Sequence, residues 1–155
     1  MRFVAAIRPD GPGAFPSTGA HGCYLSHLQT LQQAQHDGVK RLLVLEDDVM
    51  FIGENAKGDN MVNVGLPSRS GSDKFRDAVL SQWVPALDQF APQLIYISAG
   101  FDAHREDDMG NLGFVEADYA WVTRQLMAVA QTHAGGRVVS CLEGGYVMSP
   151  LARSV

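Results

Sequence analysis

The most informative stretch of the sequence is LIYISAGFDAH (94–104), in which an apolar segment ends in a glycine turn and an acidic side chain. The first five residues predict a buried β-strand, and Gly100 lets the backbone turn sharply before Asp102. The same pattern recurs in RLLVLEDD (41–48) and in VVSCLEGGY (138–146). Three apolar strands that each end in polar groups are typical of a parallel sheet with a site at one edge.

Helical patterns separate these strands. Apolar side chains at helical spacing over residues 25–34 predict a helix that ends at Gly38. A longer pattern with Ser72 as its N-cap contains Pro85, which predicts a kink or a split into two helices. A further helix is predicted over residues 115–133, before two glycines.

Two shorter apolar stretches, residues 2–7 and 61–64, predict additional short strands. Strands that alternate with helices of this length predict parallel βαβ units with right-handed crossovers. We therefore expect an α/β fold: a small layered structure with a mainly parallel sheet. A chain of 155 residues fits one domain, over residues 1–155.

Composition excludes several classes of protein. A formal net charge of −5 argues against a nucleic-acid partner, and no apolar run is long enough to span a membrane. The first residues lack the apolar core of a signal peptide, so we expect a cytoplasmic location. Cys23 and Cys141 are expected to be reduced thiols that pack as small hydrophobes. His21 and His27, six residues apart, do not predict a metal site.

Polar groups follow each predicted strand, at the edge where ligands bind in open α/β sheets. The acidic run Glu46-Asp47-Asp48 suits a divalent cation, although carboxylates at strand ends are also common solvated terminators. Asp102 is a candidate ligand, and His104 is expected to be a surface group or an outer neighbour of the site. Tyr146 presents a phenol on a glycine-rich turn, or packs as an ordinary aromatic residue.

From about Asn60 to its end the chain resembles the C-terminal part of a bacterial class II histone-deacetylase-like amidohydrolase. The stretches that carry this resemblance are VNVGLP (62–67), GSDKFRDAV (71–79), VPALDQFAPQLIYISAGFDAHREDDMGNL (84–112), DYAWVTRQLM (118–127) and SCLEGGYVMSPLA (140–152). The resemblance implies that Asp102 is a zinc ligand and that Tyr146 polarises the acyl carbonyl.

From Met1 to about Phe51 the chain instead resembles glycosyltransferase family 25. The stretches that carry this resemblance are AIRPDGPGAFPSTGAHGCYLSHLQTLQQAQ (6–35) and LLVLEDDV (42–49). It implies that Glu46, Asp47 and Asp48 lie in a region for a sugar nucleotide and its metal.

The two resemblances predict a fusion with a junction over residues 52–59, of recombined or engineered origin. The deacetylase-like part lacks the paired histidines that act as general base in that family, and the aspartate-valine-histidine element that supplies two zinc ligands. If the strands are superimposed, Asp48 stands at the position of that aspartate and Met50 at that of the histidine. A thioether is a poor zinc ligand compared with imidazole.

Three hypotheses for the function follow. The first is a non-catalytic fusion without a cofactor, which forms homo-oligomers through exposed apolar surface. The second is a residual zinc-dependent deacetylase that uses Asp102 and Tyr146, with Asp48 as a further ligand. The third is sugar-nucleotide binding or glycosyl transfer through residues 46–48, with manganese or magnesium.

Overall fold

The computed structural model describes residues 7–46 and 62–155. In chain order its elements are α1 (Thr18–His36), β1 (Leu42–Glu46), α2 (Ser72–Ala78), the π-helical turn η2 (Val79–Trp83), α3 (Val84–Phe90), β2 (Leu94–Ala99), α4 (Glu116–His133), β3 (Val138–Leu142) and α5 (Met148–Ser154). Among the helices described, none has the length and apolar character needed to span a bilayer.

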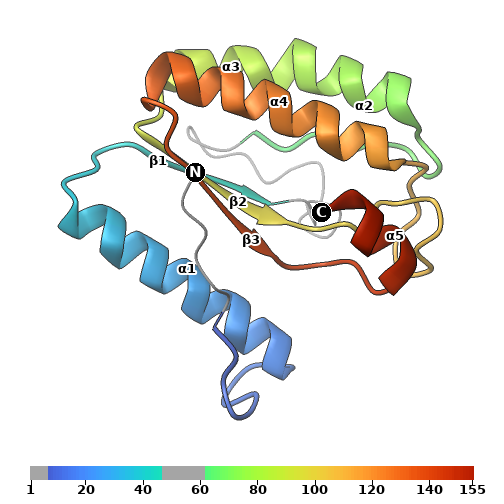
Figure 1. The fold of residues 1–155 in the computed structure, drawn as a ribbon, viewed down its shortest axis with the longest axis horizontal. Helices are drawn as coiled ribbons and strands as arrows, with labels where there is room; N and C mark the ends of the chain where they lie inside the picture. Colours follow the sequence, from blue (N-terminus) through green and yellow to red (C-terminus); the bar gives the residue numbers. More distant parts are fainter. Residues whose placement is uncertain (1–6, 47–61) are drawn as a thin grey trace.

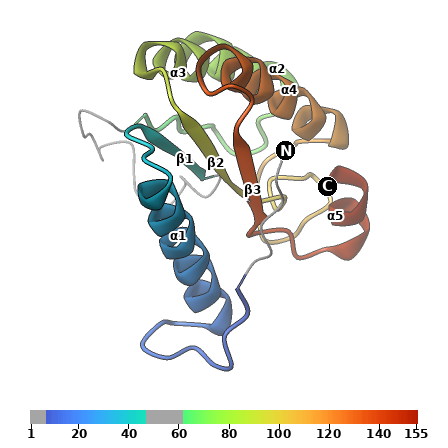
Figure 2. The ribbon, with the colours of Figure 1, turned by 60° about the vertical axis from the view of Figure 1, so that its left-hand side comes forward.

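The three strands form one parallel sheet in the order β1-β2-β3. Helices α2, α3 and α4 cover one face of this sheet, and α1 lies on the other face (Figure 1; Figure 2). Helix α5 lies beside the carboxyl ends of β2 and β3 (Figure 1). The predicted α/β fold with a small parallel sheet is therefore confirmed.

The face of the sheet under α4 is apolar. Ile95 of β2 is fully buried there, and Ile97 packs against the same cluster. The buried members of this cluster are Leu87, Ile95, Leu126, Val129, Ala130, Ala134 and Val138. Burial of a large aliphatic side chain contributes about 1.5 to 3 kcal/mol, so this layer is a large source of apolar stabilisation.

The opposite face, under α1, is polar. Because side chains alternate along a strand, Tyr96 and Ser98 of β2 point away from the apolar cluster, and both are buried. Helix α1 contributes the buried residues Ser26 and Thr30, whose hydroxyls donate to carbonyl oxygens one turn earlier in the same helix. Such internal hydrogen bonds allow polar side chains to be buried at low cost.

Most predicted elements form close to their expected bounds. Helix α1 ends before Gly38, whose φ of 71° suits glycine, and α4 ends at His133 before two glycines. The predicted kink or split at Pro85 takes another form: the backbone stays helical from α2 through η2 into α3, and the proline occupies the first turn of α3, directly after the π-helical turn.

Three expectations differ from the structure. Gly71, and not Ser72, is the N-cap of α2, because the Ser72 hydroxyl donates to Asp118 at 2.8 Å. Residues 62–64 form no strand, and α5 was not predicted. Residues 2–6, residue 61 and the expected junction at 52–59 lie outside the described residues.

The two cysteines are free thiols, as expected, but their surroundings differ. Cys141 is buried and fits the expected small hydrophobe. Cys23 is half-buried and lies against His27 and Glu143, so it is part of a polar cluster.

Candidate functional site

The turns after β2 and β3 meet at the carboxyl edge of the sheet. Phe101 N–H donates to the carbonyl oxygen of Gly144 at 3.1 Å, and Glu143 N–H donates to that of Ala99 at 2.9 Å. A Cβ atom on Gly144 would lie 3.0 Å from Oδ1 of Asp102, so glycine leaves room for this carboxylate. Asp102 therefore lies against the turn that carries Tyr146.

The Asp102 carboxylate is suited to bind a cation. Its side chain is half-buried, and within residues 7–46 and 62–155 it makes no hydrogen bond or ion pair. A partly desolvated carboxylate without a compensating donor is costly unless something outside these residues balances its charge. Carboxylate oxygen is also an ordinary zinc ligand. This single residue therefore fits a metal centre.

The turn that carries Tyr146 is held by a buried carboxylate that sequence analysis missed. Asp107 is 6% exposed, and its Oδ2 accepts the backbone N–H groups of Tyr146 at 2.7 Å and of Val147 at 3.0 Å. Its Oδ1 accepts the N–H of Met109 at 3.0 Å. Burial acts to raise the pKa of Asp107, but these three donors outweigh it and lower the pKa below its usual value.

The phenol of Tyr146 itself faces outward, with 60% of the residue exposed. The preceding Gly145 has φ = 118°, and a Cβ there would lie 3.0 Å from Leu151 and 3.1 Å from Phe101. Only glycine fits this conformation and this space. The turn is thus fixed at its backbone while its aromatic side chain is accessible to a ligand.

The acidic run after β1 is described only in part. Glu46 is the last residue of β1 and pairs in register with Ser98, which puts it at the same edge of the sheet. Asp47, Asp48 and Met50 lie outside the described residues. The expected approach of Asp48 to Asp102 therefore stays a prediction.

His104, Glu106 and Glu116 offer ligand-type atoms within 4.8 Å of one another, but they form an ion-pair network. Arg153 donates from Nε to Glu116 at 2.6 Å and from Nη2 to Glu106 at 2.9 Å. This guanidinium lowers the pKa of Glu116 to about 2. A fixed positive charge occupies the place that a cation would take.

His104 has a structural position in this network. It was expected at the surface or as an outer neighbour of the site, and the surface position is wrong, because His104 is only 1% exposed. Its Nδ1 accepts the N–H of Glu106 at 3.1 Å, which places the proton on Nε2, 3.6 Å from Glu116. Because Nδ1 already accepts a backbone N–H and Nε2 faces a glutamate that Arg153 neutralises, His104 supports the loop after Asp102.

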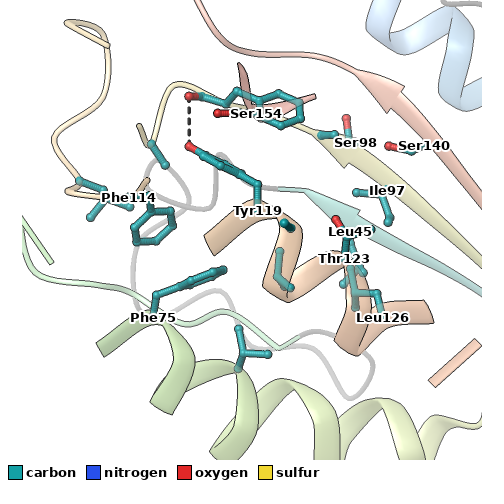
Figure 3. Close-up of a pocket in the computed structure, with 18 of the residues that line it drawn as sticks. Leu45, Phe75, Ile97, Ser98, Phe114, Tyr119, Thr123, Leu126, Ser140 and Ser154 are labelled. Carbon is teal, nitrogen blue, oxygen red and sulfur yellow. Dashed lines mark hydrogen bonds between the residues drawn. The ribbon is translucent and has the colours of Figure 1, made fainter. Parts of the chain in front are cut away.

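A cavity of about 960 Å³ lies on the apolar face of the sheet, between the strands and the helices α2 and α4 (Figure 3). Tyr119 donates its hydroxyl to the carbonyl oxygen of Phe101 at the end of this cavity nearer the edge (Figure 3). Asp102 and Tyr146 do not line it. The cavity therefore follows the apolar layer and reaches the ends of the strands at Gly100 and Phe101, without Asp102 or Tyr146 in its lining.

Comparison with known proteins identifies one family for nearly the whole chain. The family model of the histone deacetylase domain matches residues 11–155. A probable deacetylase of Archaeoglobus fulgidus is 31% identical over 176 aligned positions, which cover 92% of this chain and 49% of that protein. The chloroplastic histone deacetylase 14 of Arabidopsis thaliana is 36% identical over 186 positions, which cover 97% and 44%.

A solved structure supports the same fold. The structure of the histone deacetylase Clr3 has a TM-score of 0.63 at 25% identity, over 76% of this chain and 26% of that chain. The chain spans about half the length of the curated relatives described above. Their alignments are longer than its 155 residues, so these relatives contain segments that it lacks.

These findings overturn the predicted fusion. The family match begins at residue 11, well inside the segment assigned to glycosyltransferase family 25, and nothing supports a transferase site at Glu46, Asp47 and Asp48. The structure gives a physical reason against a fusion of two proteins, because β1 pairs in parallel register with β2 and belongs to the same sheet. A helix, an apolar strand and an acidic terminus are a local pattern that many α/β proteins share, so this pattern was a poor guide to family.

Proposed function

Because the chain belongs to the histone deacetylase domain family, we propose that it supplies a zinc-dependent site for the hydrolysis of acetylated amines. In this proposal Asp102 is a metal ligand, and Tyr146 donates a hydrogen bond to the acyl carbonyl. The observation that carries the proposal is the position of the Asp102 carboxylate against Gly144, within the turn that presents Tyr146. The earlier hypothesis of a non-catalytic fusion is wrong, because one family accounts for residues 11–155.

The fold family implies a metal, usually zinc. Asp102 fits such an ion, and we propose Asp48 as a second ligand. When bound, zinc acts as a Lewis acid that polarises a carbonyl group. Met50 supplies only a thioether where the family has histidine, so we expect weaker zinc affinity than three strong ligands would give.

Tyr146 acts on the carbonyl oxygen of the substrate. Its phenol donates a hydrogen bond that strengthens as negative charge develops on this oxygen, which is the type of interaction that accelerates acyl transfer. The bond helps only if the donor is already in position. Asp107 supports this requirement, because it holds the backbone of Tyr146 and Val147 through two hydrogen bonds.

The test is an activity assay of the zinc-supplemented chain on an acetyl-lysine peptide and on an acetylated polyamine. Tyr146→Phe is expected to lower kcat about 10²- to 10³-fold, as for other oxyanion donors. Tyr24→Phe, which alters an exposed tyrosine that packs at a tilt against Phe15, is the matched control and is expected to leave kcat unchanged.

Metal content gives a second readout that does not depend on activity. Asp102→Asn is expected to lower zinc retained after dialysis, and Met50→His to raise both zinc retention and turnover. No turnover by the unmodified zinc-loaded chain, or equal turnover by the Tyr146→Phe variant, would contradict the proposal. A cytoplasmic location, homo-oligomers and the absence of nucleic-acid partners stay predictions.

A further inference from the structure

The polar face of the sheet holds a second group of ligand-type side chains, formed by Cys23, His27 and Glu143. Cys23 and His27 lie one turn apart on α1, and Cys23 Sγ is 3.7 Å from His27 Nε2. Glu143 follows β3, and its Oε1 accepts the thiol proton of Cys23 at 3.2 Å. Glu143 is distant in sequence from the two α1 residues, and it approaches Cys23 because α1 crosses this face of the sheet (Figure 2).

Ser98 connects the histidine to the carboxylate. Its hydroxyl donates to Glu143 Oε2, and His27 Nε2 lies 3.3 Å from the same hydroxyl oxygen. Since the serine proton is directed to the carboxylate, its oxygen accepts the proton on Nε2 of His27. One proton on the Cys23 thiol and one on the His27 imidazole therefore lie among the three side chains. The sulfur and the ring nitrogen can bind a metal when these protons leave them, and the Glu143 carboxylate can bind it as it is.

We propose that Cys23, His27 and Glu143 bind a transition-metal ion of the zinc class, at a site that shares no residue with Asp102 and Tyr146. Zinc bonds of about 2.3 Å to sulfur and 2.0 Å to nitrogen or oxygen put tetrahedral ligand atoms about 3.5 Å apart. The two distances from Cys23 Sγ, 3.7 and 3.2 Å, bracket this value.

Charge favours the same conclusion. The thiolate and the carboxylate together balance a divalent ion, with neutral imidazole as the third ligand. Within the described part of the chain, no arginine or lysine forms an ion pair with Glu143. The His104 network differs in this respect, because Arg153 already neutralises its two glutamates.

One adjustment is needed. Ser98 now separates His27 from the carboxylate, so the Glu143 side chain must rotate toward Nε2 when the ion binds. Glu143 is an exposed residue, so its side chain is not fixed by burial in the interior. Ser98 can keep its hydrogen bond to the carboxylate and orient it from outside the ligand shell.

The test is titration of the reduced full chain with Co(II), which gives a charge-transfer absorption band only when a thiolate binds it. The unmodified chain is expected to show this band, and Cys23→Ser to lose it. Cys141→Ala is the matched control and should keep the band. His27→Gln and Glu143→Gln are each expected to weaken affinity at least about tenfold, whereas His36→Gln, on the last turn of α1, should not.

Asp102→Asn separates this site from the proposed catalytic metal, and it is expected to retain the cobalt–thiolate band in full. Calorimetry in buffers of different ionisation enthalpy should report release of one proton per ion near neutral pH, from the thiol. Circular dichroism confirms that each variant is folded. Absence of the band in the unmodified chain, its persistence in Cys23→Ser, or its loss in Asp102→Asn would overturn the proposal.

Discussion

The two faces of the sheet differ in what they bury. Under α4 the strands present Ile95 and Ile97 to an apolar layer, whereas under α1 the same strand presents Tyr96 and Ser98 to hydroxyls, a thiol and an imidazole. Side chains alternate along β2, so this one strand presents a different chemistry to each face, and the helix that covers each face matches it. The apolar face is expected to determine stability, and the polar face and the strand ends to determine chemistry.

The largest expected effect is on the apolar face. Ile95→Ala removes a side chain that is fully buried in the cluster with Leu126 and Val129, and should lower the free energy of unfolding by about 2 to 5 kcal/mol. Val139→Ala, at a half-buried position of β3, is the control and should cost clearly less. Urea denaturation measures both, and equal losses would remove the distinction between the faces.

The charged residue Asp118 is buried among the helices of the apolar face and gives a second test of the comparison. Asp118 is fully buried at the start of α4, where it accepts from Arg76 at 3.0 Å and from Val115 N–H at 3.1 Å. Asp118→Ala should lower the free energy of unfolding by about 2 to 3 kcal/mol, because these donors lose a charged acceptor. In the same denaturation experiment the exposed Asp73→Ala should stay close to wild type.

A substitution of Asp107 tests the carboxyl edge of the sheet, where the two faces meet. Its pKa is lowered in the folded state, so it stabilises the fold above its ordinary pKa of 3.8, and this contribution is lost as pH falls through the lower folded value. Thermal unfolding between neutral pH and about pH 2 should show a steeper acid loss for wild type than for Asp107→Asn. In the deacetylase assay the same variant should lower kcat and leave KM nearly unchanged. An unaltered kcat would show that the carboxylate has a structural role only.

The smallest effect is expected on the polar face. Tyr96→Phe removes a buried hydroxyl that has no hydrogen-bond partner of good geometry among the described residues, so the free energy of unfolding should change by less than about 1 kcal/mol. Burial raises the pKa of this phenol, which means that folding favours its neutral form and that stability falls at alkaline pH. Absorbance titration should show one late-ionising tyrosine in wild type that is missing from Tyr96→Phe.

Local patterns were sufficient to predict the three strands of the sheet, the C-terminal ends of α1 and α4, and the position of Asp102 directly after a strand. Gly38 and Pro85 act on their own backbone, and the apolar stretch at 94–98 is buried in a parallel sheet as its composition indicates. Asp102 was predicted at the sheet edge because it follows such a strand. These inferences need only neighbouring residues.

Long-range contacts could not be predicted in this way. The hydrogen bond from the Tyr146 N–H to the Asp107 carboxylate joins residues far apart in the chain, and no local motif signals it. The approach of Cys23 to Glu143 is of the same kind, although the spacing of Cys23 and His27 on one helix face was a usable signal. The mistaken glycosyltransferase resemblance likewise depended on a local pattern, whereas family membership was shown by the match across the chain.

The order of the strands has a consequence for how the chain folds. Among the described strands β1 pairs only with β2, and Leu42 finds its partner Leu94 only after the intervening residues have been synthesised. The connection from β2 to β3 contains α4, whose Leu126, Val129 and Ala130 pack in one cluster with Ile95 and Val138. We expect the unit β2-α4-β3 to fold first and β1 to dock later. Pulse-labelled hydrogen exchange during refolding should protect amides of α4 before those of β1, and the reverse order would exclude this sequence of events.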